Sequence, residues 1–170
     1  IWGMHNWPGM DVGKVGVHDG ACMAAADMFE IQLTGIGGHA AMPDMGIDPI
    51  PCGTALVQSL QTIVSRRVPP SQSAVVSVTI FEAGSALNVI PDTVRLGGTA
   101  RSFSPEIRRL LQTAIKDVSE SMAEAYGCKI AFEWEPGYPP TINHAESAAR
   151  ATAIASHIVG ADNIIANPEP

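Results

Sequence analysis

The chain has 170 residues, of which 46% are hydrophobic and 16% are charged, and its formal net charge is −7 at pH 7. This length accommodates one domain of ordinary size with flanking segments. Basic residues cluster only in the pairs Arg66-Arg67 and Arg108-Arg109, which argues against a nucleic-acid ligand, because neutralising phosphates requires a basic face.

The first 24 residues are rich in Gly and Met and carry only short apolar patches, which predicts strands or loops that pack on another body of the protein. The chain starts without an initiator Met and stops in a turn-like run at residues 167–170. We therefore expect both ends to be cut from a longer protein.

A clear pattern begins near position 27. Phe29, Ile31 and Leu33 alternate with polar residues, and this period of two predicts a half-buried strand. Asp48 then supplies a helix N-cap and Pro49 a proline for the first turn, and apolar residues at helical spacing continue to position 66. The sequence therefore predicts a strand followed by a helix.

Three further stretches alternate or are rich in β-branched residues, and they predict strands at residues 74–81, 93–103 and 128–134. A second helix is predicted between the last two of these strands. It begins at Ser104 and Pro105, and its apolar stripe reaches Tyr126, where Gly127 suits the left-handed conformation that ends many helices.

The predicted order βαββαβ over residues 27–135 is that of a ferredoxin-like sandwich, an α+β fold in which a four-stranded antiparallel sheet carries both helices on one face. In this topology residues 74–81 form an uncharged edge strand, which needs a partner because apolar edges aggregate. After the sandwich, Asn143 and Glu146 resemble a capping box that begins an Ala-rich helix through Ile158.

Four positions hold polar residues that the fold does not require, and each has a plain explanation beside a functional one. His5 lies in a tight turn and suits a metal ligand, although, taken alone, a structural turn histidine is the favoured explanation. His39 follows two glycines at a strand end, where its ring can enter open space. Asn88 fits a turn, and Arg101 fits either a solvated sheet face or a carboxylate fork.

The other reactive residues indicate structural roles. Three widely spaced cysteines, Cys22, Cys52 and Cys128, form no C-x-x-C pair, which argues against disulfides and a zinc knot and favours a reducing, cytoplasmic setting. No apolar run reaches the roughly 18 residues of a membrane span, so we expect no membrane contact.

Five segments with a characteristic sequence follow one another along the chain: GMHNWPGMDVGKVGV, AAADMFEIQLTGIGGHAAMPDMGIDPI, QTIVSRRV, SAVVSVTIFEAGSALNVIPDTVRLGGTARSF and GYPPTIN. Together they resemble the dinuclear-metal N-acyl-amino-acid amidohydrolases, which include hippurate hydrolase, indoleacetyl-amino-acid hydrolase and related aminoacylases and carboxypeptidases. The resemblance implies a catalytic α/β domain with two divalent metal ions, interrupted by a lid that also makes a homodimer. The lid corresponds to residues 27–135, and residues 1–26 and 136–170 then belong to the catalytic domain.

The same resemblance implies roles for the four polar positions. His5 falls on a metal ligand of the catalytic domain. His39 falls on a catalytic lid histidine that steadies the oxyanion of the tetrahedral intermediate, usually in the other subunit. Asn88 and Arg101 match substrate-binding positions that hold the carboxylate end. The remaining metal ligands and the general-base glutamate lie, in the family, outside this segment.

The implied function is hydrolysis of the amide bond of N-acyl or N-aroyl amino acids by metal-bound water. The residues do not distinguish Zn, Mn, Co and Ni, and the isolated chain is expected to be inactive and to bind at most one ion weakly. The rival interpretation is a stand-alone ferredoxin-like module that dimerises, binds or regulates without catalysis. Such a module needs neither GMHNWP before the first strand nor GYPPTIN after the last, so these flanks weigh against it.

Overall fold

The structure is a computed structural model that describes residues 2–168. The chain divides into two compact units. The larger unit is formed by Ala24–Pro140, and the smaller unit by the two flanks, up to Met23 and from Thr141 onward.

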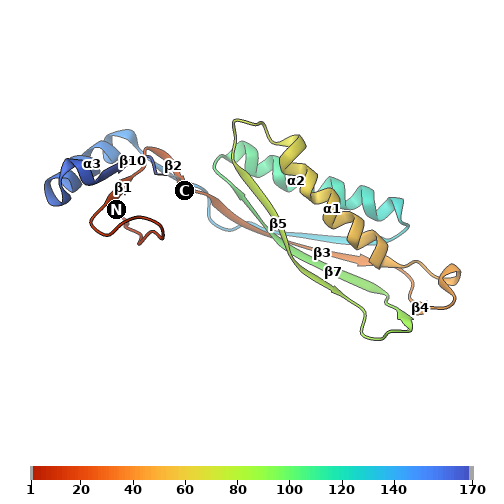
Figure 1. Ribbon diagram of the computed structural model, residues 1–170. Coiled ribbons are helices and arrows are strands. Elements are labelled where there is room, and N and C mark those ends of the chain that lie inside the picture. The colour runs from red at the N-terminus through yellow and green to blue at the C-terminus, as the bar shows by residue number, and fades with distance from the viewer. Residues whose placement is uncertain (1, 169–170) are drawn as a thin grey trace. The chain divides into compact units, whose positions relative to one another are not determined.

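Four long strands of the larger unit form an antiparallel sheet in the order β5, β7, β3, β8. Their bounds are Ala25–Thr34 for β3, Ala74–Ala83 for β5, Thr93–Ser102 for β7 and Lys129–Glu135 for β8. The helices α1 (Pro49–Arg67) and α2 (Pro105–Ala125) pack together on one face of this sheet (Figure 1). The predicted α+β class and antiparallel sheet are confirmed, and β5 is an edge strand as expected.

The core of this unit lies between the sheet and the two helices. The predicted alternation holds, because Phe29, Ile31 and Leu33 are buried while the residues between them are exposed. They meet apolar residues of both helices, including Leu60 of α1 and Ile115 of α2. Each such side chain contributes roughly 1.5–3 kcal/mol when fully buried, so the larger unit has a hydrophobic core of its own.

The helix boundaries follow from local chemistry at two of the three long helices. The Asp48 carboxylate accepts a hydrogen bond from the Ile50 amide at 2.9 Å, and the Ser104 hydroxyl accepts one from the Ile107 amide at 3.2 Å. Gly127 follows α2 with φ of 70°, in the left-handed region that disfavours a side chain. These predicted start and stop signals are confirmed.

Cys52 of α1 belongs to the core and lies beside the Cys128 thiol. Burial, reinforced by that neighbouring thiol, raises the pKa of Cys52 to about 12. The Cys52 thiol is therefore protonated at neutral pH and is a poor nucleophile, as expected of a buried structural cysteine.

The smaller unit contains two short strand pairs and a helix. Strand β1 (Val15–Val17) pairs in parallel with β10 (Ile164–Ala166), and β2 (Gly20–Met23) pairs antiparallel with β9 (Thr141–Asn143). The helix α3 spans Ala145–Val159, and a 3-10 turn follows at Ala161–Asn163. Across the described range, no helix has both the length and the apolar character needed to cross a membrane.

The predicted capping box of α3 is wrong. The N-cap residue is His144, and its side chain makes no capping hydrogen bond. Asn143 is instead the last residue of β9, and its amide donates to the carbonyl oxygen of His18 at 2.9 Å. Pairing with β2 therefore outweighs the local capping signal.

Candidate functional site

A short ribbon beyond the end of the main sheet brings two of the predicted site residues together. It consists of β4 (Gly38–His39) and β6 (Val89–Ile90), with His39 opposite Val89. The Ala40 amide also donates to the carbonyl oxygen of Asn88 at 3.0 Å. His39 and Asn88, distant in sequence, are therefore neighbours in space.

Glycines allow this ribbon to form, because neighbouring backbone approaches them closely. A Cβ atom on Gly37 would lie 2.5 Å from the carbonyl oxygen of Ile90, and one on Gly35 would lie 2.1 Å from that of Ile47. The Asp92 carboxylate accepts a hydrogen bond from the Gly37 amide at 2.9 Å. The backbone that presents His39 is thus held from both sides.

The His39 ring is exposed, and one of its nitrogens is occupied by the backbone. The Ala41 amide lies 3.1 Å from Nδ1. An amide N–H can only donate, so Nδ1 accepts, and the neutral ring carries its proton on Nε2. This loop therefore presents a hydrogen-bond donor, which suits an oxygen that gains negative charge.

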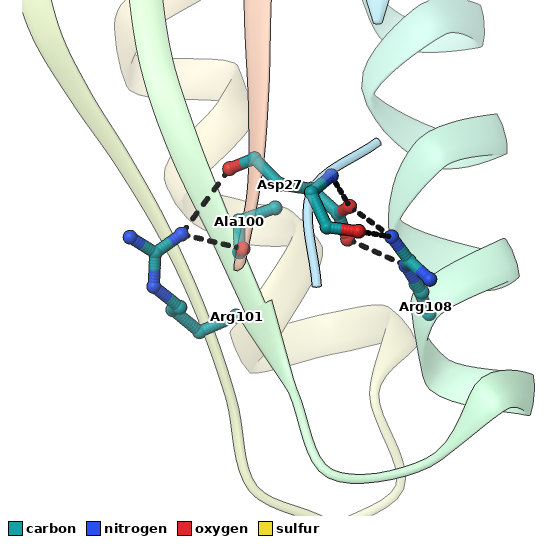
Figure 2. Close-up of polar contacts among 5 residues, drawn as sticks. Asp27, Ala100, Arg101 and Arg108 are labelled. Atoms are coloured by element: carbon teal, nitrogen blue, oxygen red, sulfur yellow. Dashed lines mark hydrogen bonds and ion pairs between the residues drawn. The ribbon is translucent and has the colours of Figure 1, made fainter. Parts of the chain in front are cut away.

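Arg101 lies at the other end of β7, where it pairs with Ala26 and Val75. Its Nη1 atom donates to the carbonyl oxygens of Asp27 at 3.2 Å and Ala100 at 3.0 Å (Figure 2). Nε and Nη2 donate no hydrogen bond to any residue between 2 and 168. Half of the guanidinium is anchored, and the other edge can bind a carboxylate.

His39 and Asn88 lie near the start of β7, whereas Arg101 lies near its end. Asn88 precedes β7, whereas Arg101 is next to its last residue. The distance from Thr93 to Arg101 along the strand is about 27 Å at roughly 3.4 Å per residue. One protomer therefore carries two separate candidate half-sites: the ribbon of His39 with Asn88, and the Nε and Nη2 edge of Arg101 (the Arg101 fork).

A buried ion pair lies beside the Arg101 fork, and the sequence reasoning missed it. The Asp27 side chain is 1% exposed and accepts from Arg108 through both oxygens, at 2.8 Å from Nε and 2.5 Å from Nη2 (Figure 2). The hydrogen bonds that Arg108 donates to the Asp27 carboxylate raise the pKa of Arg108. A signal was present, because Asp27 shares the buried parity of Phe29 and a buried carboxylate requires a partner.

His5 lies in the smaller unit, on a hollow of about 440 Å³ that Asn6, Trp7, His18 and Cys22 also line. Throughout residues 2–168, no three His, Cys, Asp or Glu side chains converge closely enough to hold a metal ion. The residues present therefore do not fit a complete metal centre.

Comparison with known proteins places these features in context. Residues 25–127 match the family described as the peptidase dimerisation domain. N-acetylcysteine deacetylase from Bacillus subtilis is 39% identical over 170 residues, which cover 100% of this chain and 44% of that protein. N-acyl-L-amino acid amidohydrolase from Geobacillus stearothermophilus is 42% identical over 150 residues, covering 88% of this chain and 40% of that protein.

A solved structure from Bacillus subtilis, described as a dinuclear metal binding peptidase from the M20 family, superposes with a TM-score of 0.77. It is 31% identical in sequence, and the match covers 98% of this chain and 40% of that one. The chain thus spans less than half the length of the curated relatives it matches.

Proposed function

Because the chain belongs to the peptidase dimerisation domain family, which confirms the predicted resemblance, we propose that it is the lid and dimerisation part of an amidohydrolase that cleaves the amide bond of N-acyl or N-aroyl amino acids. Residues 27–135 form the lid, with ferredoxin-like topology, and residues 1–26 and 136–170 belong to the catalytic domain. The cysteines, none of them in a disulfide, support a cytoplasmic setting. The match to relatives runs through both flanks, which disfavours a stand-alone module.

The observation that carries the proposal is the pair of half-sites on one sheet. His39 donates a hydrogen bond from Nε2–H to the oxyanion that forms when the amide carbonyl is attacked, and such donors act mainly in the transition state. Asn88 and the free edge of Arg101 hold the substrate carboxylate. In the complete enzyme His5 would be one ligand of two divalent metal ions, the other ligands would come from outside this chain, and the ions would supply an activated water.

An N-acyl amino acid is too short to span the two half-sites of one protomer. We therefore assign His39 and Asn88 of one protomer, and Arg101 of its partner, to the same substrate. If two β5 strands pair antiparallel about a two-fold axis, the strands of one protomer run opposite to the equivalent strands of its partner. The ribbon end of one sheet then lies beside the Arg101 end of the other. The two β7 strands are then separated by three strand spacings, about 14 Å in all.

The two edges of the sheet differ in a way that favours pairing through β5. No charged residue occurs in β5 before Glu82, and Val75 is 49% exposed. The opposite edge, β8, exposes Lys129, Glu133 and Glu135, and charged side chains of this kind discourage edge-to-edge pairing.

Placing lysine at Val75 and Ser77 in the full-length protein should convert the dimer to monomer, because each β5 strand would present charges to its mate. Both positions face away from the helices, whereas Val76 and Val78 pack into the core. The matched control is Met28→Lys with Gln32→Lys, which adds the same charge to exposed positions of the central strand β3. Sedimentation velocity measures the outcome, and a double-lysine β5 variant that stays dimeric contradicts this interface.

Mixing two impaired variants, assayed at a substrate concentration where each is nearly silent, tests the composite site directly. In a heterodimer of a His39→Ala protomer with an Arg101→Ala protomer, one of the two sites receives an intact His39 and an intact Arg101. Random exchange should restore about one quarter of the unmodified activity, because half of the dimers are mixed and each has one working site.

The control for this experiment replaces one partner with the double variant His39→Ala/Arg101→Ala, which cannot complete either site. Native mass spectrometry counts the heterodimers in both mixtures. Heterodimers without recovered activity would show that His39 and Arg101 do not act across the dimer.

A further inference from the structure

Asp27 makes contacts on both sides of the sheet at the Arg101 half-site. Its side chain points toward α2, where it accepts both hydrogen bonds from Arg108. Its backbone carbonyl oxygen accepts from Nη1 of Arg101, whose side chain lies on the opposite face of the sheet (Figure 2). The atom that anchors the fork and the group that binds Arg108 thus belong to one residue.

The Asp27 side chain also replaces a missing part of the strand ladder. Pairing between β3 and β8 ends at Met28 and Glu135, and the next residue, Pro136, has no amide proton. The amide of Gly137 donates to Oδ1 of Asp27 at 3.1 Å, and Nη2 of Arg108 donates to the Gly137 carbonyl oxygen at 3.1 Å. Arg108 therefore binds Asp27 and the returning chain together.

Asp27, Arg108 and the Gly137 backbone together form a clamp at the start of β3. The backbone around this clamp is tightly packed. The Ala26 amide donates to the carbonyl oxygen of Tyr138 at 3.0 Å. A Cβ atom on Gly137 would lie only 1.8 Å from the carbonyl oxygen of Ala26, so the two segments are in direct backbone contact. The start of β3 is thus fixed between β7 on one side and residues 137–138 on the other.

We infer that Asp27 and Arg108 are positioning residues for substrate binding, acting through the Asp27 carbonyl oxygen to hold the Arg101 fork in its carboxylate-binding position. This inference rests on the proposed function. Arg101 has a long, flexible side chain, and its one anchored nitrogen bonds only to carbonyl oxygens of residues 27 and 100. A clamp that fixes the Asp27 carbonyl also fixes the direction of Nε and Nη2, which lowers the entropy lost when a carboxylate binds.

The test is steady-state kinetics of the full-length enzyme with an N-acetyl amino acid and with the corresponding N-acetyl amino acid amide, which lacks the carboxylate. Arg108→Gln should raise KM for the acid about tenfold with little change in kcat, because the fork acts already in the ground state. KM for the amide should stay unchanged. Arg108→Lys keeps the charge and one hydrogen bond, so it should recover part of the loss and remain usable if Arg108→Gln folds poorly.

Arg109→Gln is the matched control, since Arg109 is the next residue of α2 and, among residues 2–168, binds only the exposed Glu106, at 3.4 Å. It should change KM for neither substrate. In an Arg101→Ala background, Arg108→Gln should add no further increase in KM, because its effect is transmitted through Arg101.

Two outcomes would overturn the inference in distinguishable ways. If Arg101→Ala raises KM for the acid alone but Arg108→Gln affects both substrates equally, or still acts without Arg101, then the clamp is only structural and the proposed function stands. If Arg101→Ala itself fails to distinguish the acid from the amide, the carboxylate site is absent, and the proposed function fails with the inference.

Discussion

Replacing His39 with alanine in the full-length enzyme should lower kcat by about 100- to 1000-fold, the usual cost of removing one donor to an oxyanion. KM should change little, because the oxyanion that we propose His39 stabilises is absent from the bound substrate. The structure strengthens this expectation, since the Ala41 amide occupies Nδ1 and leaves the Nε2 proton as the donor. Steady-state kinetics with an N-acetyl amino acid measures both constants.

His157→Ala is a suitable control for this prediction. His157 is an exposed residue of α3, and the same change of side chain there should leave kcat unaltered. His39→Gln should retain part of the activity, because the glutamine amide also offers an N–H donor. A large rise in KM with an unchanged kcat for His39→Ala would assign His39 to ground-state binding.

The secondary structure of the larger unit was predictable because its signals are local. Asp48 and Ser104 cap their helices through the amides of residues two or three positions further on, so a short sequence window contains both partners. The buried side of β3 was likewise visible as alternation around Phe29 and Ile31.

The geometry of the site depends on distant partners that a short window does not contain. The ribbon that carries His39 forms only when residues 38–39 pair with residues 89–90. Neither two-residue segment has a sequence pattern that predicts a strand. A bulge in β5 between Val78 and Ile80 also shifts its register against β7, which reverses the faces of the following residues. The resemblance to the amidohydrolase family suggested roles for His39 and Arg101. That the two residues lie at opposite ends of β7, too far apart for one site, is visible only in the structure.

The Asp27 ion pair was predictable in part. Its parity in β3 marks it as a buried carboxylate, which indicates that a cation must lie nearby. The sequence offers several arginines and does not select among them. Packing of α2 on the sheet selects Arg108, and the adjacent Arg109 remains exposed.

Replacing Arg108 with methionine should destabilise the chain by about 3–5 kcal/mol, the usual cost of removing one partner from a buried ion pair. Within the described residues, the substitution leaves the Asp27 carboxylate, 1% exposed, with the Gly137 amide as its one hydrogen-bond donor. Arg109→Met is the matched control and should cost less than about 1 kcal/mol, because exposed ion pairs contribute little. Urea unfolding followed by circular dichroism gives both values.

The double variant Asp27→Leu/Arg108→Met separates the value of the ion pair from the cost of an unpaired charge. Apolar residues of similar volume often replace a buried pair without loss, so the double variant should be more stable than Arg108→Met alone. Recovery should be incomplete, since the Gly137 amide loses its acceptor, the Asp27 carboxylate. A double variant less stable than Arg108→Met would show that the clamp stabilises the fold through its hydrogen bonds to the returning chain rather than through neutralisation of Asp27.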